Sequence, residues 1–201
     1  MTETFDFNQN LVLEDDFVQL RPLQFSDVEN LLHISENEPE TWKYSLVPAD
    51  GKENLENYLS IAIKAREGKT EFPFVIFDKI ANRYAGSTRF YDINLPFKTV
   101  QIGYTWYGRD FRGTGINKHI KYLMLCYAFE VMGMERVEFR ADNRNEHSVR
   151  AMKSIGCKVD GILRSNMPTY GSNIRRDTIV LSILKDEWFN NVKEHLESKL
   201  R

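Results

Sequence analysis

The sequence contains few cysteines and no long apolar segment. Two cysteines, Cys126 and Cys157, occur in 201 residues, too few for the disulfide framework of a small secreted protein. No Cys/His cluster has the spacing of a zinc site, so we expect no metal. No apolar run approaches the ~20 residues that span a membrane, and residues 1–10 are polar and acidic, unlike a secretory signal. We therefore expect a cytoplasmic protein that does not enter a membrane.

The sequence also lacks a strong excess of either charge. Its 27 Lys and Arg residues nearly balance its 29 Asp and Glu residues, which leaves a formal net charge of -2. This balance gives no general reason to expect nucleic acid or an anionic membrane as partner. Hydrophobic residues make up 42% of the chain and charged residues 28%, as in ordinary soluble globular proteins, and the length suits one domain.

Hydrophobic patterns along the chain predict a mixture of strands and helices. Alternating or compact apolar runs predict strands at 17–21, 72–77, 83–91, 99–107, 136–140, 157–163 and 173–184. Helical spacing, with capping and stop residues, predicts helices between 26 and 39 and at 51–67, 116–132, 145–155 and 185–201.

The order of these elements predicts the sheet. Short connections make the strands from 72 to 107 an antiparallel meander, whereas the long helix 116–132 requires strands 99–107 and 136–140 to lie parallel. We expect an α/β (α+β) fold with a central mixed, mostly antiparallel twisted sheet of about seven strands flanked by helices. Residues 1–14 are predicted to be a loose N-terminal arm, 15–188 a single domain and 189–201 a helical C-terminal extension.

The turn between strand 99–107 and helix 116–132 has the features of an anion site. The first N–H groups of a helix lack intrahelical partners, and the helix dipole places partial positive charge there. Gly113 and Gly115 allow a ligand to approach the backbone, and Arg109, Arg112 and Lys118 add positive charge. The turn is therefore predicted to hold a phosphate or pyrophosphate.

Three motifs compete for this turn. A P-loop requires Lys and Ser/Thr after its second glycine, where this chain has Thr114 and Gly115. A dinucleotide fingerprint requires a third glycine, where this chain has Lys118. The third motif, Arg-Gly-x-Gly-x-(small), matches Arg112-Gly113-Thr114-Gly115-Ile116, with Asn117 where many such turns have Gly or Ala. A simple tight turn before a helix is the alternative to all three.

The flanking segments favour the third motif. Ile102-Gly103-Tyr104 and the run 141–157, which contains Asn145-x-x-Ser148, resemble the signatures of the GNAT superfamily of N-acetyltransferases. Residues 176–180, followed by Trp188, look like the closing segment of its ribosomal-protein alanine N-acetyltransferase branch. The resemblance runs from about Phe17 to Trp188 and implies that residues 15–188 form a GNAT domain.

The resemblance implies transfer of an acetyl group from acetyl-CoA, as co-substrate, to a primary amine by direct attack in a ternary complex. The acceptor would be a protein N-terminus or a small-molecule amine, and the protein would be a monomer or a homodimer. Ser148 and Tyr104 are the catalytic candidates, and Ser148 would give a proton or a hydrogen bond to the departing thiolate. The cofactor-binding candidates are Tyr104, Thr105, Trp106, Arg112, Gly113, Thr114, Gly115, Ile116, Asn117, Asn143, Asn145 and Ser148.

The general base is left open by the sequence. Strand 99–107 carries no carboxylate, and Gln101 stands where Glu is frequent in the resembling branch. Asp92, Asp142, Asp160, Tyr104 and a bound water are the alternatives. The missing carboxylate also motivates a second hypothesis, a catalytically inactive acyl-CoA-binding or interaction module. A nucleotide binder of the P-loop type is the third.

The acceptor is expected to bind between the two N-terminal helices and the loop 163–174. Aromatic residues of these regions are candidates to line that site, and each is equally a candidate for core packing. They are Trp42, Tyr44, Phe90, Tyr91 and Tyr170.

Overall fold

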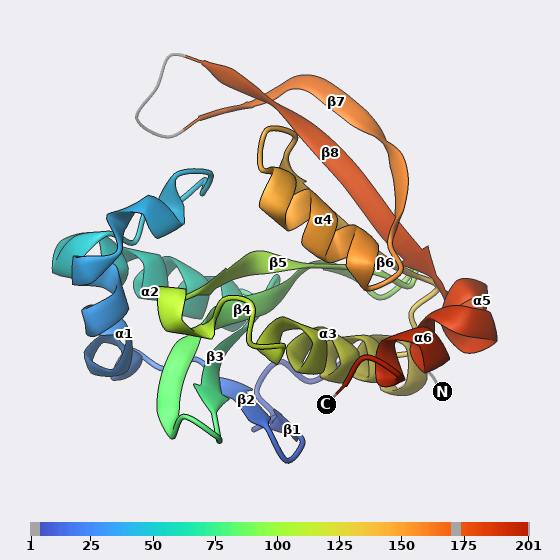
Figure 1. Ribbon diagram of the computed structural model, residues 1–201, viewed down its shortest axis with the longest axis horizontal. Coiled ribbons are helices and arrows are strands. Elements are labelled where there is room, and N and C mark those ends of the chain that lie inside the picture. The colour runs from blue at the N-terminus through green and yellow to red at the C-terminus, as the bar shows by residue number, and fades with distance from the viewer. Residues whose placement is uncertain (1–4, 170–173, 201) are drawn as a thin grey trace.

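A single mixed sheet organises the part of the chain that the structure describes, residues 5–169 and 174–200 of a computed structural model (Figure 1). Its eight strands lie in the order β1-β2-β3-β4-β5-β6-β8-β7. Neighbouring strands are antiparallel except β5 and β6, which are parallel. The strands are β1 Leu13–Glu14, β2 Val18–Pro22, β3 Phe72–Asp78, β4 Arg83–Asn94, β5 Thr99–Tyr107, β6 Arg136–Asp142, β7 Lys158–Pro168 and β8 Arg175–Leu184.

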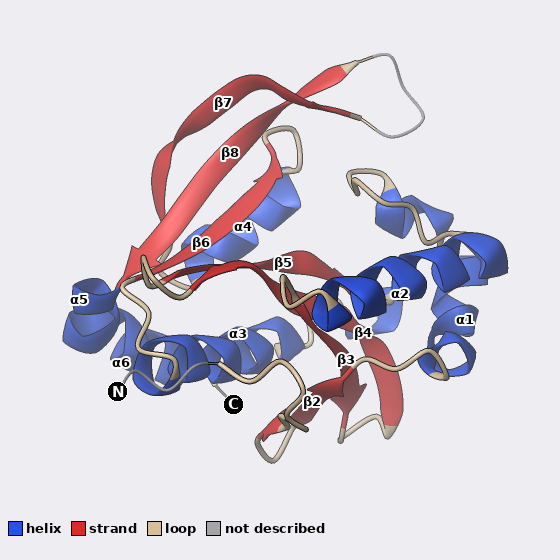
Figure 2. Ribbon diagram, turned by 180° about the vertical axis from the view of Figure 1, so that it is seen from behind, coloured by secondary structure: helices blue, strands red, loops and turns tan. Residues whose placement is uncertain are grey.

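Helices cover both faces of this sheet (Figures 1 and 2). The α-helices are α1 Asp27–Asn37, α2 Gly51–Glu67, α3 Ile116–Cys126, α4 Glu146–Ser154, α5 Lys185–Glu187 and α6 Lys193–Glu197. Short 3-10 turns lie at Pro39–Trp42 and Arg109–Phe111, and π-helical turns at Tyr127–Val131 and Trp188–Val192. Helices α1 and α2 lie on one face, over β3 to β5, and α3, α4 and α6 lie on the other.

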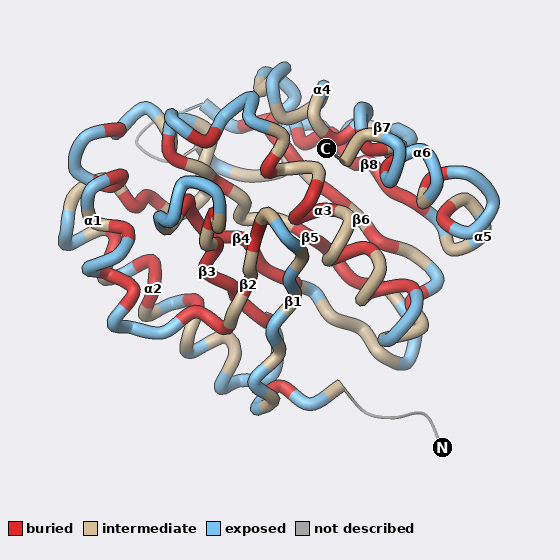
Figure 3. The backbone as a smooth tube through the Cα atoms, turned by 60° about the horizontal axis from the view of Figure 1, so that its bottom comes forward, coloured by how far each residue is buried: buried red, intermediate tan, exposed pale blue. Residues whose placement is uncertain are grey.

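The alternation of side chains along the strands produces these two layers. Phe72, Phe74 and Ile76 of β3 point into the core beneath α3, whereas Val75 points into the core beneath α1 and α2. Figure 3 shows the buried stretches following the central strands and the inward sides of the helices. Burying both faces of the same strands holds β5, which carries the predicted site, between two packed layers.

The sequence predicted this architecture closely. The antiparallel meander, the parallel β5–β6 pair and the helices at 51–67 and 116–132 are confirmed, although α3 changes to a π-helical turn at Tyr127. The prediction of seven strands was short by one, because Leu13–Glu14 pairs with β2. A strand of two residues has no alternation that a sequence pattern can detect.

The division into arm, domain and extension stays a prediction, but both end segments contribute to the core. Phe7 of the predicted arm is buried, and so are Val192 and Leu196 of the predicted extension. Trp188, the last residue of the predicted domain, is fully buried and stacks on Phe129 with ring centroids 5.5 Å apart. The segments on both sides of the predicted domain are therefore packed against it.

Candidate active site

Strands β5 and β6 separate in the middle of the sheet. They pair only over Thr99–Arg136, Val100–Val137 and Gln101–Glu138. Beyond Gln101, β5 continues beside β4 while β6 continues beside β8, and Figure 2 shows the two strands diverging. The pairing of β4 with β5 shifts register next to this point, and Tyr104 has a φ of 49°. A bulge thus bends β5 where it leaves β6, and the edge of β5 that would face β6 is unpaired.

The glycine turn exposes backbone at the N-terminus of α3. Gly113 and Gly115 have φ angles of 79° and 97°, and a Cβ on either would meet no atom within 4 Å. The N–H groups of Gly113, Thr114 and Gly115 have no hydrogen-bond partner among the described residues, whereas that of Ile116 donates to Thr114 Oγ1 at 3.4 Å. Donors without partners at a helix N-terminus fit an anionic group.

The side chains of the turn are engaged elsewhere. Arg112 donates to Tyr107 O and to Thr41 Oγ1, at 2.6 Å to the latter, so it joins the turn to the segment after α1. Asn117 accepts the Tyr107 hydroxyl at 3.0 Å, and Ile116 is buried in the core. The groups that the turn leaves available to a ligand are therefore mainly backbone N–H groups, not side chains.

The N-terminus of α4 lies on the same face of the sheet as α3. Asn145 caps this helix, because its Oδ1 accepts the N–H of Ser148 at 3.1 Å. The Ser148 hydroxyl has no hydrogen-bond partner among the described residues, so it does not bond its own backbone. Asn143 is exposed in the preceding turn, and its N–H donates to Asp177 O. Ser148 and Asn143 thus keep side-chain atoms available for a ligand.

The three predicted β5 residues point in different directions. Tyr104 and Trp106 face α2, and Trp106 packs against Trp42 with ring centroids 5.3 Å apart. Thr105 faces α3. The Arg89 guanidinium lies 4.0 Å from the centre of the Tyr104 ring, and burial raises the pKa of the Tyr104 hydroxyl. At neutral pH this hydroxyl is protonated, which suits a hydrogen-bond donor and not a base.

Lys121 is a charged residue that the sequence analysis missed. It lies on α3, is 5% exposed and donates to Thr105 Oγ1 at 2.8 Å and to Thr88 Oγ1 at 3.4 Å. No carboxylate pairs with it among the described residues, and burial lowers its pKa to about 7. Its place between Ile120 and Met124 on the apolar side of the helix was visible in the sequence.

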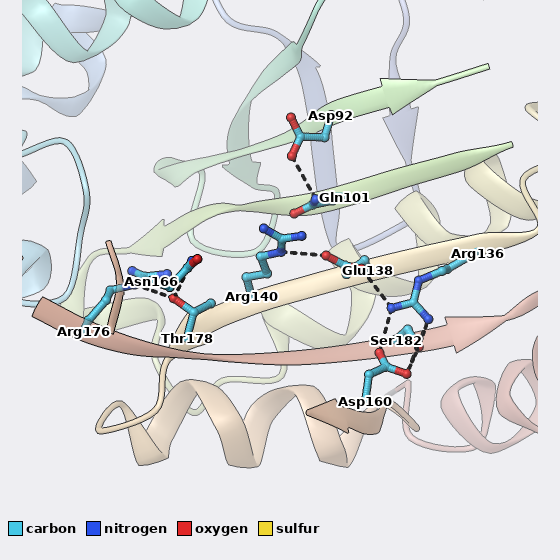
Figure 4. Close-up of polar contacts among 10 residues, drawn as sticks. All are labelled: Asp92, Gln101, Arg136, Glu138, Arg140, Asp160, Asn166, Arg176, Thr178 and Ser182. Atoms are coloured by element: carbon cyan, nitrogen blue, oxygen red, sulfur yellow. Dashed lines mark hydrogen bonds and ion pairs between the residues drawn. The ribbon is translucent and has the colours of Figure 1, made fainter. Parts of the chain in front are cut away.

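The predicted base candidates differ in their partners. Asp142 is bound by Arg144, which lowers the pKa of its carboxyl. Burial raises and Arg136 lowers the pKa of Asp160, and the net result is a lowered pKa. Asp92 accepts the Gln101 amide at 2.9 Å and has no arginine partner among the described residues (Figure 4). Only Asp92 of the three therefore has no neutralising cation.

The aromatic candidates for the acceptor site differ in burial and in the residues that they contact. Phe90 is fully buried in the core beneath α3, so it lines no acceptor site. Trp42 is buried against Trp106, and Tyr91 contacts Tyr104 with ring centroids 5.1 Å apart. Tyr170 lies outside the described residues.

Comparison with known proteins decides the family. The model of the acetyltransferase (GNAT) domain matches residues 18–158. The chain belongs to the GNAT acetyltransferase family. As a GNAT protein it is an acyltransferase, which confirms the resemblance stated from the motifs. A probable N-acetyltransferase of Bacillus subtilis, YjcK, is 28% identical over 181 residues, covering 88% of this chain and 98% of the relative.

Solved structures show the same fold. A GCN5-related N-acetyltransferase from Brucella melitensis matches with a TM-score of 0.86 at 24% identity, covering 96% of this chain and 86% of that one. Mycobacterium smegmatis RimJ, in complex with CoA-disulfide, matches with a TM-score of 0.75 at 18% identity, covering 90% and 88%. Among the described residues of this GNAT chain, no helix is long and apolar enough to cross a membrane, and no group of three or more His, Cys, Asp or Glu side chains is arranged to hold a metal ion.

Proposed function

We propose that this GNAT acyltransferase moves an acetyl group from acetyl-CoA to the primary amine of a peptide N-terminus or a small molecule. The open glycine turn beside the β5–β6 separation is the observation that carries the proposal, since Gly113 and Gly115 leave their backbone accessible and their N–H groups unpaired. The CoA-disulfide complex of RimJ, which shares the fold, supports a CoA donor.

The donor would bind on the α3–α4 face. The N–H groups of Gly113, Thr114 and Gly115 would hold the pyrophosphate, and the pantetheine arm would lie along the unpaired edge of β5 at Tyr104 to Trp106. Asn143 and Asn145, next to α4, would contact the same arm from the other side. Arg112 would act mainly by holding the turn in place through Thr41 and Tyr107.

The chemistry would be a direct attack in the ternary complex. The amine nitrogen bonds to the thioester carbonyl carbon, and the bond from that carbon to sulfur breaks. Tyr104, protonated at neutral pH, donates a hydrogen bond to the oxyanion together with N–H groups of β5. The nitrogen loses its second proton as the amide forms, and Ser148 relays a proton to the departing thiolate, which leaves as CoA thiol. Asp92, through a water, takes the proton that the attacking ammonium loses.

Release of CoA thiol tests this function. The protein is incubated with acetyl-CoA and a panel of peptides and small amines, and thiol release and acetylated product are both measured. We expect release that depends on the amine. Thermal stabilisation by CoA without thiol release on any acceptor would instead support the inactive acyl-CoA-binding module, which the Gln101 position favours. Stabilisation by ATP with Mg²⁺ but not by CoA would support the nucleotide binder.

A further inference from the structure

The sheet face opposite α3 and α4 is charged at β6 and β8. Helices α1 and α2 cover the β3–β5 part of this face, and Figure 2 shows no helix over β6 and β8. Paired strand positions place one set of side chains on this uncovered part (Figure 4). The set comprises Arg136, Glu138 and Arg140 of β6, and Arg176, Thr178 and Ser182 of β8.

The arginines of this face differ in how fully they are paired. Arg136 contacts Glu138, Asp160 and Ser182, so its guanidinium is well satisfied. Arg140 uses only Nε, which donates to Glu138 Oε1 at 2.6 Å. Among the described residues, the two terminal nitrogens of Arg140 have no hydrogen-bond acceptor.

Arg176 is the more unusual of the two, because Arg140 at least forms an ion pair with Glu138. It is 6% exposed, yet its guanidinium makes one hydrogen bond among the described residues, from Nε to Thr178 Oγ1 at 3.0 Å. No carboxylate within that part of the chain forms an ion pair with it. Burial lowers the pKa of Arg176, whereas Asp142, Tyr91 and Tyr104 raise it and Arg140 lowers it. The side chain therefore lies within electrostatic range of β4, β5 and β6.

The position of Arg176 explains this neighbourhood. The last pair between β6 and β8 joins Asp142 to Thr178, so Arg176 lies beyond the end of β6. There the separation of β5 from β6 leaves no strand between β8 and β5, and Arg176 reaches the neighbourhood of Tyr91 and Tyr104. Two cations with free donors thus flank the place where the proposed reaction occurs.

The terminal N–H groups of these two guanidiniums remain available to an anionic ligand, and partial burial strengthens such a contact. The planar guanidinium matches a carboxylate in two parallel hydrogen bonds. A phosphate fits less well, because Glu138, Asp142 and Asp92 contribute negative charge on the same side. A singly charged carboxylate is therefore the best match to this mixed surface.

We propose that Arg140 and Arg176 bind a carboxylate of the acceptor, so that the acceptor is an amine carrying a carboxylate in the same molecule. The inference rests on the proposed function, since it places the acceptor on this face. The carboxylate belongs either to a free amino acid or to an acidic residue next to a peptide N-terminus. Both supply the same chemistry to the two arginines.

Matched acceptors test the proposal. One arm compares L-alanine with L-alaninamide, and the other compares amidated peptides that begin Ala-Asp or Ala-Asn. We expect the carboxylate member of at least one pair to have a kcat/KM roughly tenfold higher, as expected for a charge-assisted hydrogen bond. The arm that shows the preference identifies the source. Equal kcat/KM within both pairs would overturn the proposal.

Three variants locate the preference. Arg140→Met and Arg176→Met should each bring the ratio of kcat/KM for the carboxylate acceptor to kcat/KM for its uncharged match towards one, chiefly through KM. Unchanged CoA affinity shows that each variant is folded. Arg136→Met is the matched control on the same face, and its ratio should stay as in the wild type. An unchanged ratio in both Arg140→Met and Arg176→Met would also overturn the assignment.

A direct binding measurement separates this inference from the proposed function. If no acceptor is acetylated, the proposed function fails. Calorimetry with CoA and either N-acetyl-alanine or its amide still tests the carboxylate site, because it needs no turnover. Tighter binding of the carboxylate form, lost in Arg176→Met, supports the site, and equal binding of the two forms contradicts it.

Discussion

The two faces of the sheet at the β5–β6 separation are built in different ways. On the α3–α4 face, the proposed donor site consists largely of main-chain N–H groups presented by a turn with two glycines. On the opposite face, side chains from β4, β5, β6 and β8 form a network of arginines and carboxylates. A main-chain site depends little on side-chain identity apart from its glycines, whereas a side-chain site changes with each substitution.

The largest expected effect tests the main-chain site. Gly115→Val should weaken CoA binding by at least about 100-fold, because the side chain projects into the space where the pyrophosphate meets the backbone. Gly133→Val is the matched control, since Gly133 also has a positive φ, of 66°, and open space at Cβ, but lies after the C-terminal end of α3. Calorimetry with CoA measures both, and equal affinities would remove the turn from the donor site.

The second prediction concerns the buried cation on the donor face. Below pH 7, Lys121 is charged in both folded and unfolded chains, and the cost of burial is fully present. Between pH 7 and its ordinary pKa of 10.5, only the unfolded chain keeps the proton, so the free energy of unfolding rises with pH. Lys121→Met should remove about 1 kcal/mol of this rise per pH unit.

Urea denaturation at pH 7, 8 and 9 measures how steeply the free energy of unfolding rises with pH in the wild type and in Lys121→Met. The variant should also be the more stable protein at pH 7, since it no longer buries a charge without a carboxylate partner. Parallel slopes would show that Lys121 keeps its proton through this range.

The third prediction tests whether a side chain contributes to the donor half of the reaction. Ser148→Ala should lower kcat roughly tenfold with little change in acetyl-CoA affinity, because the proposed role of the hydroxyl is to act on the departing thiolate. Asn145 still accepts the N–H of residue 148, so the helix cap survives the substitution. Ser154→Ala at the other end of α4 serves as control. Wild-type turnover in Ser148→Ala would exclude the residue from the mechanism.

The smallest effect is expected on the side-chain face. Arg144 lowers the pKa of Asp142, so this pair contributes stability above the unfolded pKa of about 4 that is lost as pH falls through the folded pKa. Arg144→Met should slightly reduce the free energy of unfolding at pH 7, because solvent screens an ion pair whose arginine is half exposed. In denaturation experiments the difference should shrink as the pH falls below about 4 and Asp142 gains its proton. A difference of the same size at every pH would point to packing and not charge.

The contrast between the faces also explains what the sequence could predict. Gly113 and Gly115 are recognisable in the sequence because the positive φ angles of the turn favour glycine. Asn145 is recognisable because an N-cap residue immediately precedes its helix. These features depend on neighbours in the chain, so a local pattern reveals them. The antiparallel meander and the parallel β5–β6 pair followed from connection lengths in the same way.

The proposed acceptor face depends on neighbours that are distant in the chain. Arg176 approaches Tyr91 and Tyr104 only because β8 pairs with β6 and β6 leaves β5. No spacing in the sequence expresses that arrangement. Lys121 is different, since the helical spacing of the sequence already places it on the apolar side of α3. The catalytic and cofactor-binding assignments stay predictions until a ligand is bound.

The contact of Trp188 with Phe129 has a mechanical consequence. Only three residue pairs join β5 to β6, so hydrogen bonds hold the two parts of the sheet together weakly. After β8 and the short helix α5, Trp188 lies against the π-helical turn that continues α3, where it stacks on Phe129 and its indole N–H donates to Glu130 at 3.0 Å. The chain thereby anchors its last strand to the helix that starts at the glycine turn. Because of this contact, β5 and β6 can separate at the centre of the sheet while the two parts of the domain stay joined at its edge.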